Sequence, residues 1–229
     1  MKVERRSILF LLIFILAPKP ELFCQEAKGF KLDAVTDISL GLSGAALFAA
    51  GMFLSTDAFP AGSDWNWPDE GLIFPRSEAL DLAGKVFCLA GAAGLLFIPE
   101  DFSSEKIFKV VLPYAEAFLI THGCKDILKS IFLRPRPNNS QWPEEEKYLS
   151  FPSGHTSLAF MTAAYSVYMY DDSKPGRAPK WLFALGEFGT AVLTGIFRVA
   201  SGSHYISDAA VGALLGTAVG LLVPWLHSL

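Results

Sequence analysis

The sequence predicts an all-α fold, a bundle of six membrane-spanning helices in one domain, and three observations lead to that prediction. Hydrophobic residues make up 52% of the 229 residues and charged residues only 18%, whereas an ordinary soluble domain is about 25% charged. The apolar residues come in six blocks of about 20 residues, the length of a helix that crosses a bilayer. Connectors rich in proline, glycine and charged residues separate these blocks.

The N-terminal segment, residues 1–27, is predicted to be a signal peptide or an N-terminal anchor, followed by a membrane domain over residues 28–229. Lys2, Arg5 and Arg6 precede an apolar run over residues 8–17. This order matches a secretory signal, and the run is too short to span a bilayer comfortably. Gln25 and Ala27 mark a cleavage site only weakly, so both interpretations stay open.

The six blocks lie near residues 35–54, 80–98, 107–131, 154–170, 181–200 and 205–226. Small residues recur in them at four-residue spacing, as in Gly212, Gly216 and Gly220, and such spacing lets helices approach closely in lipid. Tryptophans stand at or near block ends, where interfacial aromatic residues are expected: Trp65, Trp67, Trp142 and Trp181. Each block is therefore predicted to be one membrane-spanning helix.

The composition excludes several classes of function. A net charge of −4 and the absence of a Lys/Arg-rich tract argue against a nucleic-acid partner. Cys24, Cys88 and Cys124 lack the spacing of a zinc site or a redox pair, and we expect Cys88 and Cys124 to be packing residues. Because no metalloprotease, phosphate-loop or EF-hand motif is present, we expect neither a metal nor a cofactor.

Three polar islands interrupt the apolar pattern. The first contains Lys129 and Arg136–Pro137, the second Ser153, Gly154 and His155, and the third Arg198, His204 and Asp208. They lie at the end of the third block, at the start of the fourth, and around the connector that leads into the sixth. Because successive spans alternate in direction, all three islands are expected to meet at one membrane surface.

The residue types in these islands suit a phosphoryl group. Arginine presents a planar fork that matches phosphate oxygens, and a helix that opens at Gly154 offers free backbone N–H groups to an anion. Asp208 follows His204 by four residues, so both are expected on one helix face. The aspartate can then orient the imidazole so that its other nitrogen attacks, while His155 serves as a general acid.

The three islands resemble the signature of the type 2 phosphatidic acid phosphatase (PAP2) family, which is related to the vanadium haloperoxidases. That signature reads Lys, six residues, Arg-Pro; then Pro-Ser-Gly-His; then Ser-Arg, five residues, His, three residues, Asp. It matches Lys129 to Arg136–Pro137, residues 152–155, and Arg198 to Asp208. The neighbouring Arg134–Pro135 does not match, because no lysine lies at the required distance before it. The one departure from the signature is Phe197, which stands where the family usually has serine.

The resemblance implies a six-helix transmembrane bundle of the PAP2/haloperoxidase type and a metal-independent phosphatase. Its substrate would be a phosphorylated lipid of the bilayer: phosphatidate, phosphatidylglycerophosphate, a prenyl diphosphate or lipid A. His204 would form a phosphohistidine, Asp208 would activate His204, and His155 would protonate the leaving group. The phosphate would be held by Lys129, Arg136, Ser153, Gly154 and Arg198.

Other functions fit the same residues less well. A phosphotransferase would pass the phosphate from His204 to another lipid, a vanadate-dependent haloperoxidase would be soluble and larger, and a non-catalytic lipid-binding protein would lack one of the catalytic residues. Outside the islands, His122, Lys125 and Asp126 either extend the site or form a structural polar cluster. His227 is expected to be solvated.

The charges of the connectors predict a multi-pass protein of a bacterial-type cell membrane with its active site on the outer, periplasmic face. Basic residues outside the islands concentrate on the connectors of the other face, which the positive-inside rule assigns to the cytoplasm: Lys106, Lys109, Lys174, Arg177 and Lys180. A cleaved signal at residues 1–27 would reverse this orientation.

Overall fold

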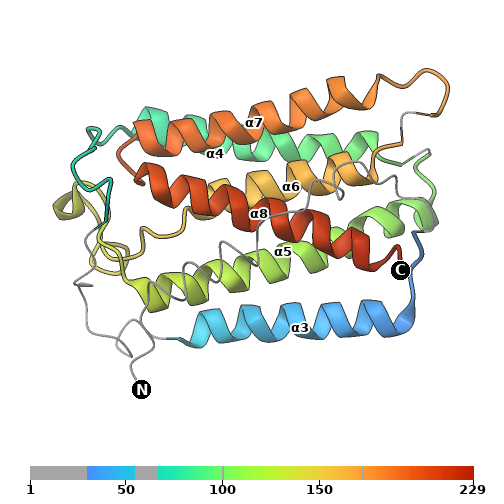
Figure 1. Ribbon diagram of the computed structural model, residues 1–229, viewed down its shortest axis with the longest axis horizontal. Helices are drawn as coiled ribbons and strands as arrows, with labels where there is room; N and C mark the ends of the chain where they lie inside the picture. The colour runs from blue at the N-terminus through green and yellow to red at the C-terminus, as the bar shows by residue number, and fades with distance from the viewer. Residues whose placement is uncertain (1–29, 55–66, 100, 172) are drawn as a thin grey trace.

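Within the part of the chain that the structure describes, six α-helices run along the long axis of the molecule and alternate in direction (Figure 1). The fold is that of a computed structural model, which describes residues 30–54, 67–99, 101–171 and 173–229. The helices are α3 (Ala34–Phe53), α4 (Glu78–Ala92), α5 (Ser104–Phe132), α6 (Gly154–Met169), α7 (Lys180–Ala200) and α8 (Ile206–Leu226), with short 3-10 helices η2 (Ala93–Phe97) and η3 (Asn139–Gln141). These residues contain no β-strand, so the predicted all-α class is confirmed.

Five of the six predicted blocks correspond to one α-helix each, and the block at residues 80–98 corresponds to α4 together with η2; the predicted ends lie within one helical turn of the observed ends. The predicted signal peptide or anchor over residues 1–27 lies outside the described residues, as do Cys24 and Trp65. The division of the chain at residue 28 therefore stays a prediction.

Among the described residues, five helical segments are long and apolar enough to cross a membrane: α3, α4 with η2, α5, α7 and α8. Their outer surfaces expose large apolar side chains, such as Leu42, Leu89 and Leu185, and a soluble monomer rarely exposes so much apolar surface. The 16-residue helix α6 is shorter and packs against α4, α5, α7 and α8. The chain is a multi-pass membrane protein with α6 at the centre of the bundle.

Glycines of α8 allow it to lie directly on the backbone of α6. A Cβ atom at Gly212 would come within 2.7 Å of the Ser153 carbonyl oxygen, and one at Gly216 within 2.7 Å of the Met161 nitrogen. Both distances are too short for a real side chain, so the close approach requires glycine. The starts of α6 and α8 are consequently held together, and the Ser153 N–H donates a 3.0 Å hydrogen bond to the Asp208 carbonyl.

The end of α5 turns the chain across the end of the bundle. Leu133 closes the helix with a left-handed conformation, φ 41°, which is uncommon for a residue with a side chain. The segment from Arg134 to Pro137 then continues without helical structure, and its two prolines cannot extend a helix. This turn brings Arg134 and Arg136 from α5 toward the start of α8.

His227 is buried, so the expectation that it is solvated was wrong. Its Nε2 lies 2.8 Å from Oε2 of Glu116 on α5, and its Nδ1 lies 3.4 Å from Oδ1 of Asp37 on α3. The backbone N–H of Lys31 also donates to the His227 carbonyl at 3.0 Å. The residue after α8 therefore packs between two other helices, and ionic partners offset the cost of burying it.

Gly216→Ala should lower the free energy of unfolding by about 1–3 kcal/mol, the usual effect of overpacking, because the new Cβ would collide with the backbone of α6. Reversible unfolding in mixed detergent micelles measures this change. The matched control is Gly189→Ala on α7, where no atom lies within 4 Å of the added Cβ. The control shares the gain in helix propensity, so equal stabilities of the two variants would contradict the contact.

Candidate active site

The three polar islands meet in a cavity of about 590 Å³. It lies at the end of the bundle where α5 and α7 end and α6 and α8 begin (Figure 1). Six of the predicted site residues line it: Lys129, Arg136, Gly154, His155, Arg198 and His204. Two do not, because Ser153 and Asp208 are completely buried behind the cavity wall.

The hydrogen bonds of His204 define its tautomer. Nε2 lies 3.4 Å from Nη1 of Arg136, and Nδ1 lies 2.8 Å from the Ser150 carbonyl oxygen. Arginine can only donate and a carbonyl can only accept, so the proton is on Nδ1 and Nε2 carries a lone pair. Burial, followed by the positive charges of Arg136, Arg198 and Lys129, holds the pKa of His204 well below its usual value. His204 is therefore a neutral base whose unprotonated Nε2 faces the guanidinium of Arg136.

Asp208 lies beside His204, but the two do not share a helix face as predicted. His204 precedes α8, which begins at Ile206, so helical spacing does not apply to it. Oδ2 of Asp208 lies 3.6 Å from Nδ1 of His204 and accepts hydrogen bonds from the Ser150 hydroxyl (2.6 Å) and the Tyr205 N–H (2.9 Å). The carboxylate is close enough to stabilise a positive imidazole ring, although Nδ1 donates to Ser150.

Arg136 enters the site from the segment after α5. Its guanidinium donates to the carbonyls of Glu146 (3.0 Å) and Ser203 (3.1 Å) and stacks on the Trp142 ring at 4.2 Å. Arg76 stacks on the same ring at 3.9 Å. Burial is the main cause that lowers the pKa of Arg136, to about 10, so the side chain stays charged at neutral pH.

Arg198 reaches the cavity from the last turn of α7 and forms an ion pair with Asp81 on α4. Asp81 also accepts a hydrogen bond from the Ser203 hydroxyl at 2.6 Å and lies 2.8 Å from Nζ of Lys85. Asp81 and Lys85 were not predicted as site residues, although two ionisable residues four positions apart in an apolar block are a signal of function. Asp81 anchors Arg198 and thereby fixes one wall of the cavity.

The remaining predicted residues lie at the junction of α5 and α6. Lys129 donates to the Leu149 carbonyl, and Gly154 begins α6, where the first backbone N–H groups have no partner within the helix. The Ser153 hydroxyl hydrogen-bonds to Thr156 at 2.9 Å rather than facing the cavity. His155 follows in the first turn of α6 and lines the cavity.

His122, Lys125 and Asp126 form a polar cluster that also borders the cavity. Oδ2 of Asp126 lies 2.9 Å from Nδ1 of His122, and its Oδ1 lies 2.5 Å from Nζ of Lys125. His122 and Lys125 line the cavity. Both interpretations of the cluster hold in part: Asp126 binds its neighbours, and the basic side chains extend the site.

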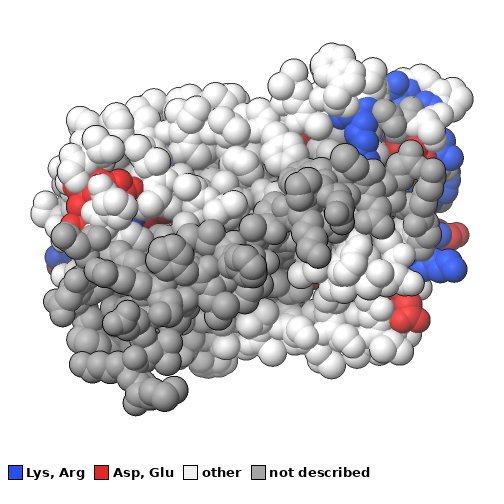
Figure 2. Space-filling model, viewed as in Figure 1, with Lys and Arg blue, Asp and Glu red and all other residues white. Residues whose placement is uncertain are grey.

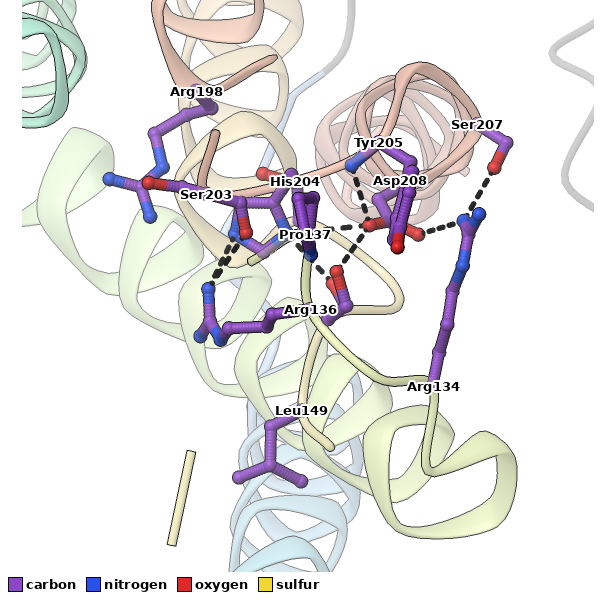
Figure 3. Close-up of polar contacts among 12 residues, drawn as sticks. Arg134, Arg136, Pro137, Leu149, Arg198, Ser203, His204, Tyr205, Ser207 and Asp208 are labelled. Carbon is purple, nitrogen blue, oxygen red and sulfur yellow. Dashed lines mark hydrogen bonds and ion pairs between the residues drawn. The ribbon is translucent and has the colours of Figure 1, made fainter. Parts of the chain in front are cut away.

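Arg134 approaches the opposite side of the His204–Asp208 pair from Arg136, as Figure 3 shows. Its Nη1 lies 2.5 Å from Oδ1 of Asp208, and its Nη2 lies 2.7 Å from Oδ1 of Asp69. Arg134 was not predicted as a site residue, because no lysine precedes it at the distance that the family signature requires. The sequence feature that could have identified Arg134 as part of the site is its position two residues before Arg136.

The cavity combines groups that can bind an anion with a nitrogen, Nε2 of His204, that can act as a nucleophile toward it. Lys129, Arg136 and Arg198 supply positive charge, and the start of α6 supplies backbone donors. Nε2 of His204 offers a lone pair at the same place, and His155 provides a second titratable ring. This combination suits transfer of a negatively charged group to a histidine.

Comparison with known proteins identifies relatives of this chain. A family model described as the PAP2 superfamily matches residues 110–229. The rat phospholipid phosphatase-related protein type 1 is 40% identical over 83 residues, which are 34% of this chain and 25% of that protein. The lipid A 1-phosphatase of Porphyromonas gingivalis is 35% identical over 80 residues, which are 35% of this chain and 17% of that protein. The chain thus matches a quarter or less of the length of these two relatives.

Two solved structures are also similar. LpxE of Aquifex aeolicus is 26% identical with a TM-score of 0.45, over 65% of this chain and 87% of that one. The transmembrane PAP2-type phosphatidylglycerolphosphate phosphatase of Bacillus subtilis is 20% identical with a TM-score of 0.48, over 95% of this chain and 92% of that one.

NMR of histidine labelled with ¹³C and ¹⁵N should show that His204 stays neutral, with its proton on Nδ1, well below pH 6.5. Arg136→Gln should raise the pKa of His204 toward 6.5, because the charge of Arg136 is the largest cause of its depression after burial. The His204 signal is assigned from its loss in His204→Gln, and Arg177→Gln on the far connector serves as the control. A wild-type pKa at or above 6.5 would contradict the geometry.

Proposed function

Because the chain belongs to the PAP2 superfamily, we propose that it is a metal-independent phosphatase of membrane lipids. It hydrolyses a phosphate monoester or diphosphate of a lipid such as phosphatidate, phosphatidylglycerophosphate, a prenyl diphosphate or lipid A. The observation that carries the proposal is the unprotonated Nε2 of His204, which faces Arg136 in a cavity also lined by Lys129 and Arg198. The names of relatives that act on lipid A or phosphatidylglycerolphosphate support a lipid substrate.

In the first step of the proposed reaction, the phosphate binds among the three cationic side chains and the N–H groups at Gly154. Nε2 of His204 attacks phosphorus, and the bond from phosphorus to the lipid oxygen breaks. His155 gives its proton to that oxygen. The imidazole ring becomes positive, and the carboxylate of Asp208 stabilises it.

In the second step, water attacks the phosphohistidine, and His155 takes the proton of that water. Inorganic phosphate leaves, and Nε2 of His204 regains its lone pair. The cationic side chains stabilise the negative charge that spreads over the phosphoryl oxygens in both transition states, a role that a metal ion fills in other phosphatases.

An apolar groove next to the site supports a lipid substrate. It has a volume of about 500 Å³ and lies between α6, α7 and α8, with Thr156, Phe160, Ile196 and Ala213 in its walls. Thr156 is in the same first turn of α6 as His155. A hydrocarbon chain in this groove would place its phosphate end near the cavity.

His204→Ala should abolish phosphate release from lipids, by at least about 10³-fold, because it removes the nucleophile. A panel of phosphorylated lipids, assayed in EDTA, measures this loss, and phosphatase activity that is lost in EDTA and restored only by Mg²⁺ would contradict metal independence.

His155→Ala should slow hydrolysis most for substrates with poor leaving groups, because His155 protonates the leaving oxygen. Labelled phosphate trapped on the enzyme should be acid-labile and alkali-stable, and label on Ser153 would contradict the assignment. Transfer of the label to a second lipid instead of water would identify a phosphotransferase.

We further propose that the site faces the periplasm of a bacterial-type cell. Figure 2 shows Lys and Arg side chains gathered at the end where α6 leads into α7. This end carries Lys174 and Arg177, and the positive-inside rule places such connectors in the cytoplasm. The catalytic end is the opposite one.

Cysteine labelling should place residue 139 outside and residue 173 inside. Asn139 and Ser173 are both exposed, and they lie on connectors at opposite ends of the bundle. After removal of Cys24, Cys88 and Cys124, an impermeant maleimide applied to intact cells should label Asn139→Cys and not Ser173→Cys. Permeabilised cells control for reactivity, and the reverse pattern would turn the site toward the cytoplasm.

A further inference from the structure

Arg134 is a buried cation that does not touch the cavity. Only 1% of its surface is exposed, and it is absent from the residues that line the site. Its guanidinium lies between the rings of Trp67 at 4.1 Å and Tyr205 at 3.9 Å. Since it cannot reach a bound phosphate, any part that it plays in the reaction must pass through the groups it contacts.

Arg134 contacts Asp208, the carboxylate that lies beside the proposed nucleophile His204. Nη1 of Arg134 binds Oδ1 of Asp208 at 2.5 Å and the Ser207 hydroxyl at 2.7 Å. The other oxygen of Asp208, Oδ2, faces Nδ1 of His204 at 3.6 Å and accepts from Ser150 at 2.6 Å. Arg134 thus fixes the rotation of the carboxylate, so that Oδ1 is occupied and Oδ2 is directed at the imidazole ring (Figure 3).

Asp69 holds Arg134 in this place. Its Oδ1 accepts from Nη2 of Arg134 at 2.7 Å, and its Oδ2 accepts from the backbone N–H of Ser207 at 2.7 Å. Ser207 is in the first turn of α8, where a carboxylate is favoured by the helix dipole. One guanidinium therefore joins two carboxylates, and both carboxylates are attached to the start of the same helix.

We propose that Arg134 is a positioning residue for the His204–Asp208 pair, held by Asp69. The inference rests on the proposed function of His204 as the nucleophile. When Nε2 of His204 bonds to phosphorus, the imidazole ring becomes positive. The negative charge on Oδ2 of Asp208, which lies near Nδ1–H, then stabilises the ring. Arg134 keeps the carboxylate of Asp208 oriented for that step, and the arginine on the other side, Arg136, lines the phosphate-binding cavity.

Arg134→Lys keeps the charge but loses the planar fork that joins two carboxylates. Vanadate, whose trigonal-bipyramidal adduct resembles the transition state of phosphoryl transfer, should inhibit the enzyme and can be used to count its active sites. We expect kcat per active site to fall on the order of 10- to 100-fold, as a small misplacement of catalytic groups does. KM and the vanadate inhibition constant should stay unchanged. The matched variant is Arg136→Lys in the same segment, which should weaken vanadate binding. Asp69→Asn should lower kcat in the same direction as Arg134→Lys, by a smaller factor.

The ¹⁵N NMR signal of the His204 Nδ1–H is a readout that does not depend on turnover. It should shift in Arg134→Lys and in Asp69→Asn, and a merely structural role would leave it in place in the folded fraction. If Arg134→Lys does not fold, Asp69→Asn decides the question. Unchanged kcat and an unchanged His204 signal would overturn the proposal, as would a loss of vanadate binding equal to that of Arg136→Lys. A wild-type protein without lipid phosphatase activity would refute the proposed function, and the NMR signal would still test Arg134.

Discussion

Because Gly212, Gly216 and Gly220 have no side chains, α8 lies directly against the backbone of α6, and the catalytic end is built on that contact. Helices in lipid associate through close packing rather than through a hydrophobic driving force. The contact holds the start of α6, which carries His155, beside the start of α8, which follows His204. His155 in α6 and His204 in the segment before α8 are thereby held at the same cavity.

The ionisable groups at this end are placed in pairs, and the pairs determine which charges remain for a ligand. Asp81 neutralises part of the charge of Arg198 and Lys85, and Arg134 forms an ion pair with Asp208. Lys129 instead donates to a backbone carbonyl. Buried charges are costly unless they are paired. The surplus positive charge in the cavity therefore favours the binding of an anionic ligand.

The sequence predicts the six helices, because each is a long apolar block, and it predicts the cavity, because alternating spans bring the islands together. It does not predict contacts made across long stretches of chain. Arg134 binds Asp69 and Asp208, 65 and 74 residues away, and this depends on the left-handed turn at Leu133. The helix-face argument for His204 was wrong because the helix begins after it.

The shortness of α6 sets the depth at which its first residue, Gly154, lies in the bilayer. Sixteen residues make a helix about 24 Å long, whereas the hydrocarbon layer is about 30 Å thick. The charged connector that follows α6, with Asp171 and Lys174, belongs in water, so the other end of the helix stops short of the opposite surface. A phosphate at Gly154 would lie slightly below the head groups. The lipid would need to sink by only a few ångströms and to keep its chains in the bilayer, whereas a bulky group attached beyond the phosphate would have to fit inside the cavity.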